Sequence, residues 1–372
     1  MNKDGFEKLR IAILTFHTAN NYGAVLQAYA LQEYLSQEYG NTRILDYHNK
    51  DIDRSYAKPS IFALIHNPKK TVFKLFQSIL FKGKNDRIDQ FRKEYLKLTK
   101  RYEFDNIVQA NEEADAFITG SDQVWNYMII GKDTTFFLDF ALKEKLTCSY
   151  AASIGVKEIP GTFVDLYRNA LSHIKTISVR ETAGVQTLEK IGIEDVEVMP
   201  DPTLLLSKER WEQFSVTPSI KGKYILVYKI TTSDKMIYFA KELSRITKLP
   251  VIYIPNDLKS GIIGSLRIDV GPREWLGYIR NAEYVVTNSF HGTVFSILFG
   301  VKFFSEVSQK VNPSTSRILT LLSLFGFENR TIDCFAVEIL DKELPISHVA
   351  EVCLKQQKRA RQFFDKVLLG EG

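Results

Sequence analysis

Short apolar runs alternate with helix-like segments along the first part of the chain. The run Ile11–Phe16 is typical of a strand that is buried on both faces of a parallel sheet. Residues 24–37 are apolar nearly all round and end before Gly40, which predicts a well-buried helix. This order predicts a βαβ start. Further strands are expected at 42–48, 114–120, 146–154, 175–180 and 196–200, with a helix within 161–173.

The alternation restarts after a polar segment at 215–223, whose proline and glycine are typical of a linker. The pattern therefore predicts two Rossmann-like, doubly wound α/β domains, at 1–215 and 216–346. A last basic helix lies within 347–372, and packing back on the N-terminal domain is one option for it. In the second domain we expect strands at 224–230, 250–255, 284–289 and 301–304, and helices at 235–247, 273–280 and 293–300.

An insertion at about 54–110 interrupts the first domain and has helical, basic character. Between Arg54 and Arg101, thirteen lysines and arginines stand against three acids, a local net charge of +10 in a chain of net charge +5. The amphipathic stretch 69–84 favours peripheral contact with an anionic membrane, and a solvated helical surface is the open alternative. Nucleic-acid binding is not expected, because no recognised motif or interleaved aromatic residues accompany the charge.

Composition narrows the class of protein. The chain is 45% hydrophobic and 25% charged, which is typical of a soluble globular protein. Three widely spaced cysteines without a CxxC pair favour a reducing compartment. There is no signal-peptide core and no apolar run of membrane-spanning length, so we expect a cytoplasmic protein. The P-loop and the dinucleotide fingerprint are missing, which argues against nucleotide cofactors.

Candidate chemistry lies in the loops that follow the predicted strands. In doubly wound sheets ligands bind beyond the carboxyl ends of the strands, and two such domains enclose a cleft. Four loops meet this condition: 15–23 with His17, Asn20, Asn21 and Gly23; 119–126; 178–181; and 287–293. Histidines 17, 48, 66, 173 and 348 have no ligand spacing among them, so no metal site is expected.

The loop 287–293 carries the strongest chemical signal. His291 and Gly292 are placed at the start of the following helix, where free backbone N–H groups favour phosphate or carboxylate. A histidine in this position can bind an anion or move a proton. A capping loop with a structural histidine is the alternative.

Three further charged residues follow predicted strands. Arg180 can bind a carboxylate or phosphate in bidentate fashion, or form a salt bridge with Glu181 or another acid. Asp122, in a tight turn, can be a base, an acceptor for a sugar hydroxyl, or a helix cap. Asp201 lies between two prolines, which favours a rigid turn over a catalytic role.

Five motifs, in order, resemble the polysaccharide pyruvyl transferases: F-H-T-A-N-N-Y-G-A-V-L-Q-A-Y-A-L-Q, I-T-G-S-D-Q-V-W-N, S-V-R-E, D-P-T-L-L-L and N-S-F-H-G-T. The resemblance spans residues from about 11 to 300. It implies a GT-B-like fold, phosphoenolpyruvate as donor, and a sugar of a cell-surface polysaccharide or its lipid-linked precursor as acceptor. The product would carry pyruvate as a ketal across two hydroxyls, with release of phosphate and without a cofactor.

The resemblance places His291 and Arg180 at the donor site. Because His291 and Asp122 follow strands in opposite halves of the chain, we expect His291 to act as acid or phosphate-side catalyst and Asp122 to orient or deprotonate the sugar hydroxyl. The expected donor contacts are completed by Ser289, Gly292, Thr293 and Arg317. The expected acceptor contacts are Asn20, Asn21, Tyr22, Gly23 and Ser121, since uncharged amides suit sugar hydroxyls; a plain turn and cap is the alternative for the two asparagines.

The sequence departs from the family pattern before His291. Many relatives have a basic residue there, where this chain has Ser289 and Phe290. Arg317 or Lys302 is expected to replace the missing charge.

Two other functions stay open. One is a nucleotide-sugar glycosyltransferase of the same fold, with Glu274 or Glu283 binding a ribose. The other is a non-catalytic binding protein for a phosphorylated metabolite.

Overall fold

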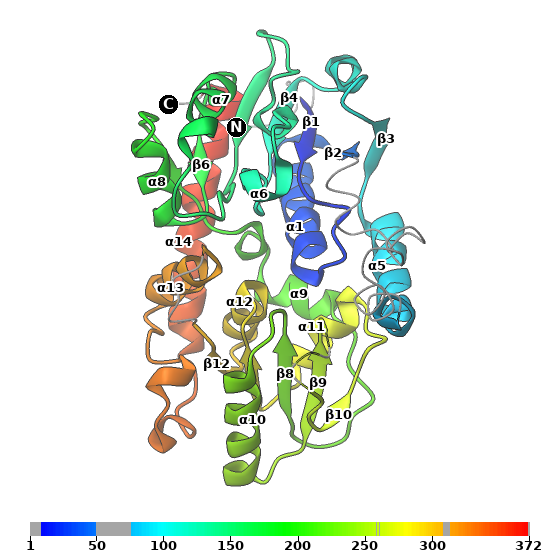
Figure 1. Cartoon of the computed structure of the whole chain (residues 1–372), viewed down its shortest axis with the longest axis vertical. Coiled ribbons are helices and arrows are strands. Elements are labelled where there is room, and N and C mark those ends of the chain that lie inside the picture. The colour runs from blue at the N-terminus through cyan, green and yellow to red at the C-terminus, as the bar shows by residue number, and fades with distance from the viewer. Residues whose placement is uncertain (1–8, 50–75, 258, 260, 308–312, 371–372) are drawn as a thin grey trace, which may run out of the picture.

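The computed structural model describes residues 9–49, 76–257, 259, 261–307 and 313–370. Its N-terminal domain is built on a parallel sheet with strand order β3-β2-β1-β4-β5. Strand β1 is followed by the buried helix α1 (Tyr22–Glu38), so the predicted βαβ start is confirmed (Figure 1). The strands span Leu9–Leu14 (β1), Gly40–Tyr47 (β2), Leu98–Tyr102 (β3), Ala116–Thr119 (β4) and Leu146–Ser149 (β5).

A two-stranded parallel sheet continues this domain beyond β5. It pairs β6 (Ser178–Val179) with β7 (Glu197–Val198). The helices of this part of the chain are α6 (Tyr127–Ile130), α7 (Gly161–Leu171), α8 (Thr182–Glu189) and α9 (Lys208–Phe214), of which α8 packs on β6 and β7 and α9 lies at the domain boundary (Figure 1). Strand β6 therefore carries the predicted loop with Arg180 towards the same side as the loops after β1 and β4.

The C-terminal domain repeats the architecture with strand order β10-β9-β8-β11-β12, again all parallel. The predicted fold class of two Rossmann-like domains, as in GT-B proteins, is confirmed by this topology. The strands are Ile225–Lys229 (β8), Val251–Pro255 (β9), Ser265–Leu266 (β10), Tyr284–Thr287 (β11) and Lys302–Ser305 (β12). The helices are Asp234–Thr247 (α10), Pro272–Arg280 (α11), Phe290–Phe299 (α12) and Pro313–Phe325 (α13).

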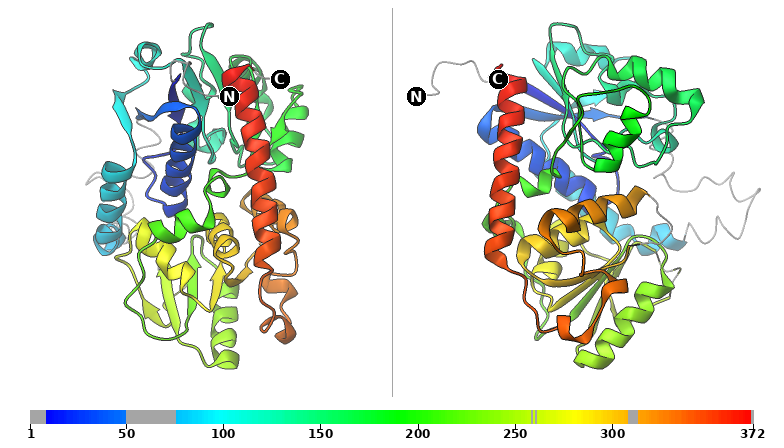
Figure 2. Two further views of the ribbon diagram at one scale, coloured as in Figure 1. Left: turned by 180° about the vertical axis from the view of Figure 1, so that it is seen from behind. Right: turned by 90° about the vertical axis from the view of Figure 1, so that its left-hand side faces the viewer.

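The last helix, α14 (Ile346–Phe364), runs along both domains (Figure 2). Near its end the ring of Phe364 stacks on Tyr150 of the N-terminal domain, with centroids 4.7 Å apart. Asp365 accepts a hydrogen bond from the hydroxyl of Tyr39. The chain thus returns to the N-terminal domain, which ties the two domains together a second time.

The basic insertion is helical only in part. Helix α5 (Lys82–Tyr95) lies within it, but Leu98–Tyr102 form β3, the edge strand, so the prediction of a helical insertion is wrong there. In this strand Tyr102 is buried whereas the adjacent Lys100 and Arg101 are exposed, and charged, exposed lysine is typical of an edge strand. Residues 54–75, with the predicted membrane-contact lysines, lie outside the described part of the chain. Within the described residues no helix is long and apolar enough to cross a membrane.

Aromatic side chains join the two domains. Tyr22, at the start of α1, stacks on Trp275 of α11 with ring centroids 5.3 Å apart, and its hydroxyl donates to the carbonyl of Val270. Trp211 packs edge-on against Phe295 of α12. This apolar contact belongs to one continuous hydrophobic cluster across both domains, which holds their facing strand ends at a fixed separation.

Candidate active site

The strand ends of the two domains face each other across one cavity. In each sheet the order reverses beside the central strand, between β1 and β4 and between β8 and β11, and ligand crevices form at such points. A cavity of about 490 Å³ lies there and is lined by the loops after all four strands. The predicted interdomain cleft is therefore present. Its lining includes Asn21, Asp122, Gln123, Thr231, Asn288, His291 and Glu306.

A buried carboxylate, Asp201, joins an arginine and a histidine from opposite domains. Its Oδ1 accepts hydrogen bonds from the backbone and hydroxyl of Thr203. Its Oδ2 lies 2.8 Å from Nη1 of Arg180 and 3.3 Å from Nε2 of His291. The side chains of Asp201 and Arg180 are 0% and 2% exposed. The rigid turn predicted at Asp201 is present, because its side chain caps the short 3-10 helix Pro202–Leu204, and the turn also fixes a charged group at the domain boundary.

The charges in this cluster depend on one another. Burial alone would raise the pKa of Asp201, but the His291 imidazole and the Arg180 guanidinium outweigh it and hold the pKa well below its usual range. Arg317, from α13, adds a second guanidinium. Its burial, and then the positive charge of Arg180, lower the pKa of Arg317 to about 10. An anion bound beside both guanidinium groups would offset this unfavourable charge.

Phe290 lies against both guanidinium groups. The Cζ atoms of Arg180 and Arg317 are 4.8 and 6.0 Å from its ring centroid, within the range of cation–π contacts. Arg180 donates from Nη1 to Ser121 and Asp201, whereas its Nε and Nη2 make no hydrogen bond to any described residue. Buried donors of this kind need a partner, and an anionic ligand would supply one.

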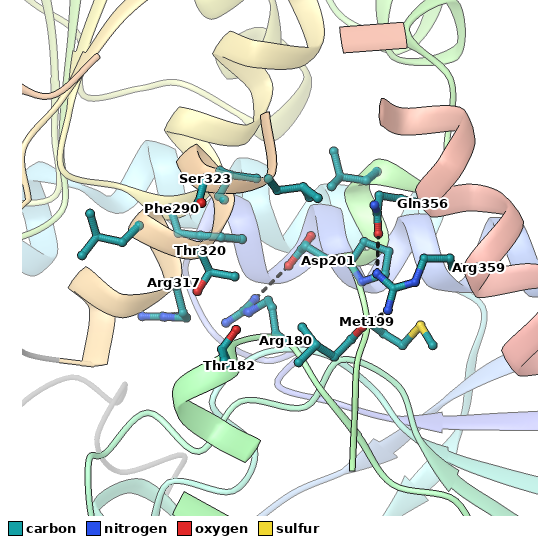
Figure 3. A pocket seen from close by; sticks show the side chains of 16 residues that line it. Arg180, Thr182, Met199, Asp201, Phe290, Arg317, Thr320, Ser323, Gln356 and Arg359 are labelled. Carbon is teal, nitrogen blue, oxygen red and sulfur yellow. Dashed lines mark hydrogen bonds and ion pairs between the residues drawn. The ribbon is translucent and has the colours of Figure 1, made fainter. Parts of the chain in front are cut away.

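A second cavity, of about 470 Å³, adjoins the same cluster (Figure 3). Arg180 points towards Asp201 in this view, and Arg317 comes in from α13. Phe290 and Arg317 line both cavities, so the two compartments share a wall. The second cavity is further lined by Thr182, Met199, Thr320, Ser323, Gln356 and Arg359.

The position of His291 depends on a glycine in the other domain. A Cβ atom built on Gly23 would lie 2.0 Å from Nδ1 of His291, well inside contact distance. The imidazole therefore packs directly on the first turn of α1, and no larger residue fits at position 23. Gly23 was expected to approach a ligand; the structure shows it in contact with the candidate catalytic histidine instead.

The start of α12 is capped by its own side chains. Ser289 is the N-cap, and its Oγ accepts from the backbone N–H of Gly292. The hydroxyl of Thr293 donates to the carbonyl of Ser289 and contacts Ser305, and its side chain is fully buried. The predicted donor contacts through Gly292 N–H and Thr293 are therefore taken by the protein itself. Ser289 lines the cleft cavity, and its contact with the donor stays a prediction.

The first loop divides into residues that face the cavity and residues that do not. Asn21 lines the cavity while its side chain caps α1 by accepting from Gly23 N–H. Asn20 accepts from Arg92 of α5, which also binds the loop's carbonyls. Tyr22 is 1% exposed and fully engaged between the domains, so its assignment as an acceptor residue is corrected to interdomain packing. His17 does not line the cavity, and its Nε2 lies 2.9 Å from Oδ1 of Asp46.

The loop after β4 supplies two predicted residues. Ser121 is completely buried and receives a hydrogen bond from Arg180, so it positions the guanidinium and presents no surface to an acceptor. Asp122 lines the cavity and has a φ of 92°, a region that costs a non-glycine residue conformational energy. Its carboxylate accepts from the N–H of Gln123. The side chain is therefore held at the cavity wall by a strained turn.

The structure separates the two candidates for the missing basic residue. Arg317 lines both cavities beside Phe290. Lys302 lies at the opposite end of its strand and pairs with Glu283 and Glu343, at 2.9 and 3.0 Å. Lys302 is thus excluded as the replacement, while Arg317 occupies a suitable position.

Sequence reasoning missed the central role of Asp201 and of Phe290. Asp201 stands in a D-P-T motif directly after a predicted strand, and this position was a usable signal. Phe290 has no comparable signal, because its role depends on two arginines from distant segments.

A comparison with known protein families identifies one match. The sequence matches the family described as polysaccharide pyruvyl transferase over residues 21–306. Among functionally curated proteins, no match was found.

The solved structures similar to this chain share little sequence with it. The UDP-GlcNAc 2-epimerase from Methanocaldococcus jannaschii is 10% identical, with 95% of this chain and 98% of that one covered and a TM-score of 0.47. The MnaA–UDP structure from S. aureus is 8% identical, with coverage of 95% and 87% and a TM-score of 0.46. The UDP-GlcNAc 2-epimerase from Neisseria meningitidis is 7% identical, with coverage of 94% and 99% and a TM-score of 0.44.

Proposed function

Because the chain belongs to the polysaccharide pyruvyl transferase family, we propose that it transfers the enolpyruvyl group of phosphoenolpyruvate to a saccharide. The acceptor is a sugar of a cell-surface polysaccharide or its lipid-linked precursor. One observation carries the proposal: the buried Arg180–Asp201–His291 cluster, with Arg317 beside it, lies where two cavities meet at the domain boundary.

The donor fits the cationic part of the site. Phosphoenolpyruvate carries a carboxylate and a phosphate, and both suit guanidinium groups. Arg180 has two donor nitrogens without a hydrogen-bond partner among the described residues, and Arg317 lies on the same aromatic ring. We assign the two anionic groups of the donor to these arginines, with the methylene carbon towards His291.

The acceptor fits the polar part of the cleft. Apart from His291, Asp122, Glu306 and Arg317, the polar side chains there are uncharged amides and hydroxyls. Such groups bind sugar hydroxyls without the desolvation cost of a full charge. We assign the acceptor to the cleft cavity, next to Asn21 and Asp122.

The chemistry needs one acid and one base. His291, as an imidazolium next to the Asp201 carboxylate, protonates the methylene carbon, which becomes a methyl group. The central carbon then carries positive charge and is attacked by one sugar hydroxyl, whose proton passes to Asp122. A second hydroxyl then displaces the phosphate and closes the ring; its proton passes to the now neutral His291, and the proton on Asp122 leaves with the phosphate, so that two C–O bonds form and one breaks. Asp201 acts as a positioning residue, because its Oδ2 lies 3.3 Å from Nε2 of His291 and orients the ring.

Glu274 and Glu283, the two candidates for binding a ribose, do not support the nucleotide-sugar alternative. Glu274 lies 3.2 Å from Nη1 of Arg87, and Glu283 is paired with Lys302. Neither carboxylate lines the cleft cavity. Thermal-shift measurements with phosphoenolpyruvate and with nucleotide sugars separate the two functions, because only the true donor should raise the melting temperature.

Turnover tests the proposal and also separates it from a non-catalytic binding protein. The wild-type chain is incubated with phosphoenolpyruvate and a panel of free and lipid-linked saccharides, and phosphate release and product mass are measured. We expect a pyruvate ketal on one acceptor. His291→Ala should reduce turnover at saturating donor at least about 100-fold, and His173→Ala, at an exposed site, should not change it. Near-normal turnover by His291→Ala would overturn the assignment.

A lipid-linked acceptor also requires contact with a membrane surface. Phe76 and Ile79 are 55% and 67% exposed, and the side chain of Lys82 is 69% exposed, a combination that suits anionic lipid. Lys84, at the end of the predicted membrane-contact stretch, is buried and takes no part. We expect Phe76→Ser/Ile79→Ser to reduce co-sedimentation with anionic vesicles, whereas Ile246→Ser should not. Equal co-sedimentation of both variants would exclude this contact.

A further inference from the structure

We propose that His17, Asp46 and His48 form a binding site for a divalent first-row transition-metal ion, separate from the cleft. Parallel pairing of β1 with β2 brings their carboxyl ends together. His17 follows β1, Asp46 lies near the end of β2, and His48 comes directly after it. The sequence spacing concealed this cluster, because one ligand comes from a different strand end than the other two.

The three side chains converge on one point. Nε2 of His17 lies 2.9 Å, and Nε2 of His48 3.0 Å, from the same Oδ1 atom of Asp46. All three ligand atoms lie within 4.8 Å of one another. For an ion held at about 2.1 Å, neighbouring ligand atoms at right angles are about 3 Å apart. Small side-chain shifts would therefore place an ion between the three atoms.

A backbone carbonyl orients His17 as a ligand. Nδ1 of His17 lies 3.2 Å from the carbonyl oxygen of Thr15, while Nε2 faces the carboxylate. A neutral imidazole has one N–H, so it can satisfy only one of these two acceptors. With N–H on Nδ1, the lone pair of Nε2 points at Asp46, an arrangement that a metal ion makes favourable. Metal-binding histidines are commonly held in this way by a carbonyl on the other nitrogen. An imidazolium would also satisfy both contacts, and metal titration distinguishes the two states.

The ligand types limit the ion. Two imidazoles and one carboxylate suit Zn²⁺ and its neighbours Fe²⁺ and Co²⁺ better than Ca²⁺ or Mg²⁺, which prefer oxygen ligands. His17 is 2% exposed, whereas Asp46 and His48 are about one-fifth exposed at their side chains. Water can therefore reach the open side and complete the coordination sphere.

The site would stabilise the first loop of the cleft. The carbonyl of His17 accepts from Nε of Arg92, and the same arginine binds the carbonyls of Thr18 and Ala19. None of the three ligands lines either of the two cavities of the candidate active site. A bound ion would thus fix the start of the loop that leads to Asn21, from outside the cavities.

Titration of the chelator-treated full chain with Co²⁺ alone tests the site, with visible d–d absorption and calorimetry as readouts. We expect one ion per wild-type chain. Asp46→Asn and His48→Gln should each weaken binding at least about tenfold, and His173→Gln, at an exposed position, should leave it unchanged. Zn²⁺ should raise the melting temperature of the wild type but not of Asp46→Asn. Absence of binding to the wild type, or wild-type affinity in both Asp46→Asn and His48→Gln, would overturn the proposal whether or not the chain is an active transferase.

Discussion

The imidazole of His291 lies where a side chain at position 23 would otherwise be. Its Nδ1 packs on Gly23 and its Nε2 faces Asp201, and both of these residues belong to the N-terminal domain whereas His291 belongs to the C-terminal domain. Phe290 holds the two arginines beside it through its ring. The catalytic geometry is thus specified by small contacts between residues far apart in the sequence.

Gly23→Ala tests this packing. Alanine normally favours a helix by up to about 1 kcal/mol over glycine, but here the added Cβ would displace His291. We expect lower stability, by about 1–3 kcal/mol, and a fall in turnover of roughly 100-fold. Urea denaturation and phosphate release measure the two effects.

Gly161→Ala is the matched control, because a Cβ at Gly161 meets no atom within 4 Å. It should retain wild-type stability and turnover. If Gly23→Ala behaved like Gly161→Ala, the described contact with His291 would be wrong.

Asp201→Asn tests the buried charge. The substitution removes the charge of the Asp201 carboxylate and leaves Arg180 buried without its closest counter-charge. Such a change typically costs about 3–5 kcal/mol of unfolding free energy. Because the pKa of Asp201 is held below its usual range, its contribution is present at neutral pH and is lost only as the pH falls through that low value. Denaturant titration at neutral pH measures the loss, and Glu158→Gln, in an exposed ion pair, should have little effect.

At the scale of elements, α5 connects the two domains. Its Arg92 holds the first loop of the N-terminal domain, and its Arg87 pairs with Asp269 and Glu274 of the C-terminal domain. Lys84 reaches Asn256, at the end of β9. Much of the positive charge on α5 therefore serves internal contacts and not an anionic partner.

Lys84→Met tests the buried end of this connection. Burial lowers the pKa of Lys84 from 10.5 to about 8, so the unfolded chain binds more protons between these values. Wild-type stability therefore gains from Lys84 as the pH rises from 8 towards 10.5. The stability of Lys84→Met relative to the wild type should fall by on the order of 2 kcal/mol between about pH 7 and about pH 9.5.

Urea denaturation at the two pH values measures this difference. Lys82→Met, at a side chain that is 69% exposed, should show no comparable change. If the free energy of unfolding of Lys84→Met differed from that of the wild type by the same amount at both pH values, the Lys84 amine would not be buried as described.

At the scale of the whole molecule, the sequence predicted the two parallel sheets well because buried strands form unbroken apolar runs. It missed β3, whose exposed Lys100 and Arg101 resemble the neighbouring basic helix. The strand-end rule located Arg180, Asp122 and His291. It could not show which N–H groups α12 uses for its own cap, because this depends on side-chain packing.

Contacts between distant segments were also beyond the sequence. Arg317 lies on α13, a helix that was not predicted, and reaches the site through the ring of Phe290. His17 and His48 meet only because their strands are neighbours in the sheet. Such proximity follows from strand order, which is difficult to predict from a single sequence.

The central claim is that the arginine-lined cluster at the domain boundary binds phosphoenolpyruvate. Calorimetric titration of phosphoenolpyruvate into the wild type, Arg317→Met and Arg245→Met tests it most directly, since Arg245 is an exposed arginine on α10. The account predicts binding by the wild type, roughly 10- to 100-fold weaker binding by Arg317→Met, and unchanged binding by Arg245→Met. Equal affinity of Arg317→Met and the wild type, or no binding by the wild type, would contradict it.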